Sequence, residues 1–169
     1  MSLAAELVGA FFTNGFSPAQ AFGLFFLLGS FTVATVSDLR HMAAQREFVE
    51  VWFAFAAAML VLDLWLAEFT LTAPAFLVKW GLIIALSVMS HRRVGPLFHL
   101  ATGDVAACAA AASVLPAGWV AVFFLLLKVT DVPLGPLLAR GRNAYPFMPV
   151  VTLATVLVLG LAAWASGAF

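Results

Sequence analysis

The sequence predicts an all-α protein that crosses a membrane about six times. Of its 169 residues, 64% are hydrophobic and 9% are charged, whereas a soluble domain carries roughly 25% charged residues. The apolar residues gather into six runs, and most of these approach the about 20 residues that a helix needs to cross a bilayer. All six arginines lie in the segments that follow the first, third and fifth runs. We therefore expect a polytopic membrane protein.

The predicted transmembrane helices follow one another with short connections. They cover about residues 17–37, 48–67, 74–90, 101–116, 117–134 and 147–167. Only Pro116-Ala117-Gly118 separates the fourth from the fifth, and this tripeptide is typical of a tight hairpin between antiparallel helices. Residues 1–16 are expected to form an interfacial lead-in. No repeat or linker divides the chain, so residues 1–169 are predicted to form a single domain.

The arginines set the predicted orientation. Six spans place all of them on one side of the membrane, as Arg40 and Arg46, Arg92 and Arg93, and Arg140 and Arg142. Because Arg and Lys concentrate in cytoplasmic loops, this side is expected to face the cytoplasm, which leaves the N-terminus outside. The expected location is the cell membrane, with the lipid bilayer as a partner. A net charge of zero gives no indication of a nucleic-acid partner.

Four charged residues inside the runs are expected to pair or to reach the membrane surface, because ionisable groups are costly at membrane depth. Lys79 and Asp63 lie at similar depth on neighbouring spans, and Lys128 and Asp131 are three residues apart on one helix face. The single cysteine, Cys108, lies in an apolar run and is expected to be a packing residue. A single cysteine excludes an internal disulfide.

Two carboxylates remain, Asp38 and Asp104. Asp38 ends the first span in TVSDLR and Asp104 begins the fourth in ATGD, so the predicted topology places both at the cytoplasmic side. Two carboxylates at one depth on different helices can share a proton and activate water, as aspartyl proteolysis requires. The alternatives are structural: an interfacial Asp38 beside Arg40, and an Asp104 that caps the fourth helix.

Small residues around Asp104 favour a packed position. Gly103, Ala107 and Ala111 recur every four residues, and such a face lets helices approach closely in a membrane. The fourth span is therefore predicted to be a central helix against which other helices pack.

Three short segments, taken in their order and spacing, are diagnostic. ATGD at 101–104 resembles a GxGD motif, with Gly103 as its second glycine. SDLRHMAAQREFVEVW at 37–52 resembles a segment in which a first aspartate is followed by a basic residue and an amphipathic stretch. YPFMPVVTLA at 145–154 resembles a late Pro-Phe-x-Pro segment. Together they resemble the archaeal preflagellin and type IV prepilin peptidase family of GxGD-type intramembrane aspartyl peptidases.

The resemblance implies an aspartyl endopeptidase with Asp38 and Asp104 as its catalytic pair, supported by the motif residues Gly103 and Ala101. It implies that short basic leader peptides are removed from pilin-like or archaellin precursors at the cytoplasmic membrane boundary. Glu47 and Glu50 are candidates for binding the leader, and a solvated helix face is the alternative. No metal and no cofactor are expected.

The chain departs from the family pattern at two places. Ala101 stands where the motif has its first glycine, and QREFVEV stands where Ile-Pro-Asn often follows the first aspartate. The competing interpretations are a small proton-coupled membrane transporter, because intramembrane acids also mark ion pathways, and a catalytically inactive homologue. No HExxH zinc motif and no GxSxG nucleophile motif occurs in the sequence.

Overall fold

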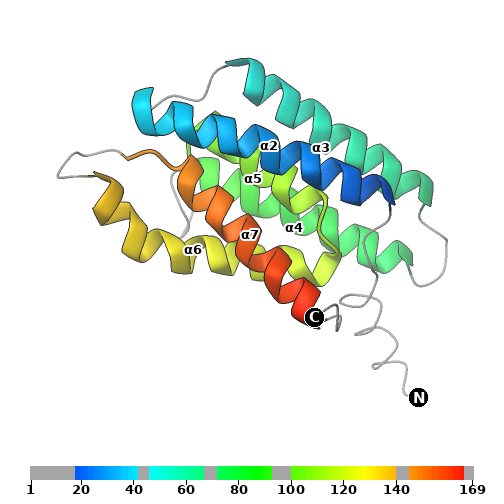
Figure 1. The fold of residues 1–169 in the computed structure, drawn as a ribbon. Helices are drawn as coiled ribbons and strands as arrows, with labels where there is room; N and C mark the ends of the chain where they lie inside the picture. Colours follow the sequence, from blue (N-terminus) through cyan, green and yellow to red (C-terminus); the bar gives the residue numbers. More distant parts are fainter. Residues whose placement is uncertain (1–17, 42–45, 67–71, 93–99, 140–144, 166–169) are drawn as a thin grey trace.

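The computed structural model describes residues 18–41, 46–66, 72–92, 100–139 and 145–165. Within these ranges the chain forms six α-helices (Figure 1): α2 (Pro18–His41), α3 (Arg46–Leu66), α4 (Thr72–Arg92), α5 (Thr102–Ser113), α6 (Ala117–Ala139) and α7 (Met148–Ala165). The predicted lead-in at 1–16 lies outside the described residues, as do Arg93, Arg140 and Arg142.

Five of these helices, all except α5, are long and apolar enough to cross a membrane. Their lipid-facing surfaces carry large exposed apolar side chains such as Phe22, Trp65 and Leu77, which a bilayer covers and water would not. The prediction of an all-α, multi-pass membrane protein is therefore confirmed.

The fourth expected span differs from the others. Helix α5 has 12 residues and is thus about 18 Å long at 1.5 Å per residue, shorter than a hydrocarbon core of about 30 Å. It ends at Ser113 because the chain turns through Val114 and Leu115 into Pro116, and a residue before proline disfavours the helical conformation. The expected hairpin between α5 and α6 lies at this turn.

Successive helices run in opposite directions, so the same end of the bundle holds the C-termini of α2, α4 and α6 and the N-termini of α3, α5 and α7 (Figure 1). Arg40, Arg46 and Arg92 all lie at this end, which we call the arginine end. Basic residues occupy the last turns of two of these helices, Arg40 and His41 in α2 and His91 and Arg92 in α4. A cation in a last turn interacts favourably with the helix dipole.

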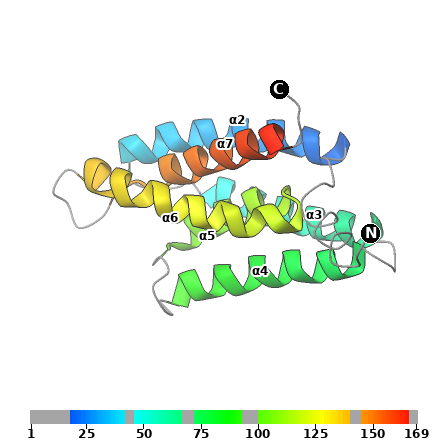
Figure 2. The ribbon, with the colours of Figure 1, turned by 90° about the horizontal axis from the view of Figure 1, so that it is seen from below.

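Helix α5 is the centre of the bundle. It packs against α2, α3, α4 and α7, and Figure 2 shows it between the α2–α7 pair and α4. Every residue from Ala106 to Ser113 is buried, including Cys108, whose thiol is free. Alanine side chains let four helices approach one backbone, so the prediction of a central fourth helix is confirmed.

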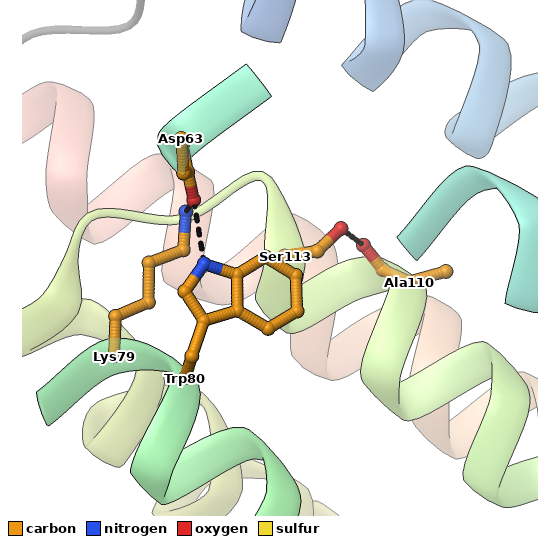
Figure 3. A network of polar contacts seen from close by, with 5 residues as sticks. All are labelled: Asp63, Lys79, Trp80, Ala110 and Ser113. Atoms are coloured by element: carbon orange, nitrogen blue, oxygen red, sulfur yellow. Dashed lines mark hydrogen bonds and ion pairs between the residues drawn. The ribbon is translucent and has the colours of Figure 1, made fainter. Parts of the chain in front are cut away.

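Polar contacts connect the helices away from the arginine end. Lys79 on α4 donates to Asp63 on α3 at 2.6 Å, and the Trp80 indole donates to the same carboxylate oxygen at 3.0 Å (Figure 3). The pairing of Lys79 with Asp63 is thus confirmed. Lys128 and Asp131 on α6 also form the expected ion pair, at 3.9 Å.

Candidate active site at the arginine end of the bundle

Asp38 lies in the last turn of α2 and is buried, with 6% of its surface exposed. Its Oδ2 accepts a hydrogen bond of 2.9 Å from the backbone amide of Met148, the first residue of α7. The backbone of Phe147 is a second hydrogen-bond partner of the carboxylate. Asp38 is therefore buried against the start of α7 rather than exposed beside Arg40.

The start of α7 explains why Asp38 is needed there. The first amides of a helix have no partner within the helix. Val150 and Val151 donate to the Phe147 carbonyl at 3.0 and 3.2 Å, and Pro149 has no amide hydrogen, which suits a first-turn position. The amide of Met148 has no partner within the helix, and the Asp38 carboxylate accepts its hydrogen bond. The negative charge also lies at the positive end of the α7 dipole.

Asp104 is the third residue of α5, in its first turn. The N-cap position belongs to Ala101, and no side chain hydrogen bonds there as a cap. Asp104 instead has the backbone of Ala101 as a hydrogen-bond partner, which is the geometry of the third position in a capping box. The carboxylate thus supports the helix start without being the N-cap residue that the structural alternative assumed.

Ala101, which replaces the first motif glycine, adopts φ −66° and ψ 160°. This is an extended conformation that any L-residue adopts. Its side chain is exposed. The alanine therefore fits this backbone without strain, and the departure from GxGD does not distort the start of α5. Gly103 follows in the first turn and is half-buried.

The two carboxylates approach one another at the arginine end. Asp38 comes from α2 and Asp104 from α5, two helices in direct contact, and the two side chains are close enough for their charges to repel each other. The two predicted carboxylates therefore lie on contacting helices, within range of each other's charge, and Gly103 and Ala101 lie beside Asp104 in the chain. Two neighbouring carboxylates of which one is protonated supply both a base for water and a hydrogen-bond donor.

Tyr145 adds a third polar group that the sequence analysis did not single out. Its hydroxyl donates a hydrogen bond to Asp131 on α6, and the charge of Asp104 also acts on it. A Cβ at Gly135 would lie 3.4 Å from the Tyr145 ring, so this glycine leaves room for the ring. The feature of the sequence that points to this residue is that Tyr145 is the only tyrosine of the chain and directly precedes the Pro-Phe-x-Pro segment.

The surroundings of Tyr145 favour its neutral form. Burial, then the hydrogen bond to Asp131 and the negative charges of Asp131 and Asp104, raise the pKa of the Tyr145 hydroxyl above its ordinary value. The group therefore stays a hydrogen-bond donor at neutral pH. Its hydrogen bond holds the Asp131 carboxylate.

Glu47 and Glu50 lie in the first turns of α3, also at the arginine end, and both are exposed. Glu50 forms an ion pair with Arg46 at 2.7 Å. With exposed side chains on both partners, this pair contributes little to stability. The two glutamates are thus accessible from solvent, and their part in binding a basic leader stays a prediction.

Comparison with known proteins adds no further assignment: no family model, no curated protein and no solved structure matches the chain. Among the described residues, no group of three or more His, Cys, Asp or Glu side chains is arranged to hold a metal ion.

Proposed function

We propose that the protein is a membrane aspartyl endopeptidase that removes short basic leader peptides from pilin-like or archaellin precursors. The observation that carries the proposal is the approach of Asp38 and Asp104 from two helices at the arginine end, close enough for their charges to interact. The resemblance of residues 37–52, 101–104 and 145–154 to the prepilin and preflagellin peptidases supplies the substrate class.

In the proposed reaction, the ionised carboxylate of the pair takes a proton from a water molecule. The water oxygen attacks the scissile carbonyl, while the protonated carboxyl donates a hydrogen bond to the carbonyl oxygen. The tetrahedral intermediate then collapses, the C–N bond breaks, and the leaving amine takes up a proton from the site. The two carboxylates exchange roles during the cycle, so a titration belongs to the pair.

The position of the pair suits a substrate with a basic leader and an apolar helix. The helix would lie in the bilayer, and the leader would remain at the surface, near the exposed Glu47 and Glu50. Asp38 and Asp104 lie near helix ends and not at the middle of the bundle, the depth at which the reaction would find water. Opposite charges on the glutamates and the leader favour this orientation.

Co-expression with a candidate prepilin or preflagellin tests the proposal. We expect the parent protein to shorten the precursor, and Asp38→Asn and Asp104→Asn to abolish the shortening while remaining in the membrane. Asp63→Asn makes the same substitution at the opposite end of the bundle and is the matched control. Because it weakens the buried pair with Lys79, its cleavage is compared per amount of folded protein in the membrane, and on that basis it is expected to be retained. Undiminished cleavage by either site variant would refute the assignment of the pair.

The second candidate is a small proton-coupled transporter, which is favoured by the same observation of carboxylates within a helical bundle. It differs in what the variants lose: Asp38→Asn would then abolish solute uptake in vesicles, with no precursor cleaved by the parent protein. An inactive homologue would show neither activity. Cleavage by the parent with loss in both variants separates the peptidase from both alternatives.

A further inference from the structure

A groove of about 540 Å³ lies between α3 and α4 and has α5 as its floor. This volume is within the about 300–1,000 Å³ typical of small-molecule sites. Its walls are almost entirely apolar, and they include Phe53, Ala57, Leu60, Ile83, Ile84 and Ala109. The groove exists because α3 and α4 each pack closely on α5 and only sparsely on one another.

The polar lining residues of this groove are gathered toward the arginine end. His91 and Arg92, in the last turn of α4, lie there together with Thr102 at the start of α5. Within the described part of the chain, no carboxylate forms an ion pair with Arg92. The entrance to the groove is therefore positively charged and has a hydroxyl group beside it.

Ser87 lies one turn deeper on α4 and also lines the groove. Its hydroxyl is buried and has no hydrogen-bond partner among the described residues. A buried polar atom without a partner is costly, and more so where lipid replaces water. The hydroxyl is thus available to an oxygen acceptor that enters the groove about 7.5 Å below Arg92, at 1.5 Å per residue.

The groove runs only part of the way along the bundle. Its deepest lining residue on α4 is Trp80, about 18 Å from Arg92 along the helix, and the Trp80 indole is held there by Asp63 (Figure 3). One leaflet of the hydrocarbon core is about 15 Å thick, half of the whole. A partner helix that crossed the membrane would need a groove along the entire depth, whereas a lipid chain occupies one leaflet.

From this match we propose that the groove is a binding site for one anionic glycerophospholipid. The phosphate contacts His91 and Arg92, with Thr102 as an additional hydrogen-bond donor. A glycerol oxygen accepts from the Ser87 hydroxyl, and one hydrocarbon chain lies over the apolar floor toward Trp80. The order of groups along α4, which is charged, then hydroxyl, then apolar, is the order of groups along such a lipid. This site is separate from the carboxylate pair and does not depend on the proposed peptidase activity.

The location of Thr102 gives the lipid a structural role. Thr102 lines the groove and is the first residue of α5, two positions before Asp104. A lipid bound there fills the space between α3 and α4 and stabilises the first turn of α5. We therefore expect the lipid to raise the thermal stability of the protein as well as to remain bound during purification.

Native mass spectrometry of the full-length protein tests the proposal. The detergent-purified protein is incubated with vesicles that contain equal amounts of phosphatidylglycerol and phosphatidylcholine with identical chains. It is then extracted again in detergent and released from the detergent in the mass spectrometer. We expect one phosphatidylglycerol per protein to be retained in preference to phosphatidylcholine. Arg92→Gln should lower this retention about fivefold, since one basic residue near an anionic lipid surface contributes about 1 kcal/mol.

Two matched controls make the result specific. Arg40→Gln removes another exposed arginine at the same end that does not line the groove, and it should leave retention unchanged. Ala57→Phe fills the groove and should abolish retention of either lipid. Ala58→Phe makes the same change at an exposed position of α3 outside the groove, and it should have no effect.

The following outcomes would overturn the proposal. Equal retention of the two lipids, or equal losses in Arg92→Gln and Arg40→Gln, would remove the charge specificity. Displacement of the lipid by inorganic phosphate alone would show that the apolar groove is not used. A protein dimer that is lost in Ala57→Phe, or an apolar precursor helix retained in preference to lipid, would identify a protein partner as the occupant.

Discussion

Asp38 accepts a hydrogen bond from the amide of Met148, so the last turn of α2 is joined to the first residue of α7 across 110 residues of sequence. The same carboxylate interacts electrostatically with Asp104 on α5. One buried side chain therefore organises the start of a helix and half of the candidate site. These two roles can be separated by mutation, because only one of them needs a carboxyl group.

Substitution at Asp38 is expected to separate stability from activity. Asp38→Asn keeps an oxygen that accepts from Met148 but loses the negative charge at the start of α7, so it should destabilise the protein by only about 0.3–1 kcal/mol. Asp38→Ala leaves the Met148 amide buried without a partner, which costs about 1–3 kcal/mol. Thermal unfolding in detergent, followed by helical circular dichroism, checks this difference. Equal destabilisation by both substitutions would contradict the hydrogen-bonding role.

The titration of Tyr145 can be observed directly, because it is the only tyrosine in the chain. Burial and the neighbouring Asp131 raise the pKa of its hydroxyl, so the ultraviolet absorbance of tyrosinate should develop only well above the ordinary pKa of about 10. Asp131→Asn should move the midpoint downward toward the ordinary value. An unchanged midpoint in Asp131→Asn would show that Asp131 does not hold the hydroxyl.

The raised pKa of Tyr145 also predicts how stability depends on pH. The folded state keeps the tyrosine proton where the unfolded state has lost it, so this contribution is complete below about pH 10 and disappears as the pH rises through the folded-state pKa. Tyr145→Phe should therefore show a smaller loss of stability over the same alkaline range. The comparison uses thermal unfolding of the two proteins at matched pH values.

Removing one partner of the buried Lys79–Asp63 pair is expected to destabilise the protein more than replacing both partners by apolar residues. The two side chains are 6% and 16% exposed, so Lys79→Met leaves a buried carboxylate without its cation and should cost about 3–5 kcal/mol. The double variant with Asp63→Leu should recover much of this loss, apart from the hydrogen bond that Trp80 donates to Asp63. Thermal unfolding of the single and double variants provides the measurement.

The exposed pair of Arg46 and Glu50 is the control for this experiment. Its side chains are 88% and 63% exposed, and Glu50→Gln is expected to leave the unfolding temperature nearly unchanged because exposed ion pairs contribute little. A large effect of Glu50→Gln combined with a small effect of Lys79→Met would contradict the burial argument.

The close packing of α5 predicts a strong dependence on side-chain size. Ala110 is fully buried at the centre of the bundle, so Ala110→Leu should destabilise the protein by about 1–3 kcal/mol or more. Ala85→Leu makes the same change at an exposed position of α4 and should be tolerated. The yield of monodisperse protein after extraction and the unfolding temperature report both effects.

Much of the fold follows from the sequence because membranes limit the alternatives. Backbone polar groups cannot stay unpaired in lipid, so long apolar runs form helices. The arginine positions predicted which of the described helix ends lie at the same end of the bundle. The equal depth of Lys79 and Asp63 on neighbouring helices predicted their ion pair. The recurrence of Gly103, Ala107 and Ala111 correctly indicated a central helix. Its length was overestimated because an apolar run continues through the turn before Pro116.

The sequence by itself thus determined the class of the protein, the alternating direction of its helices and the two carboxylates of interest. These follow from hydrophobicity, charge and small-residue spacing, which are properties of single residues and short intervals. Only the tertiary structure decided that Asp38 accepts from Met148, that Tyr145 donates to Asp131, and that α3 and α4 leave a groove between them. The physical reason is that a backbone amide donor carries no residue-specific signature, and a groove is a property of how helices separate around a common neighbour.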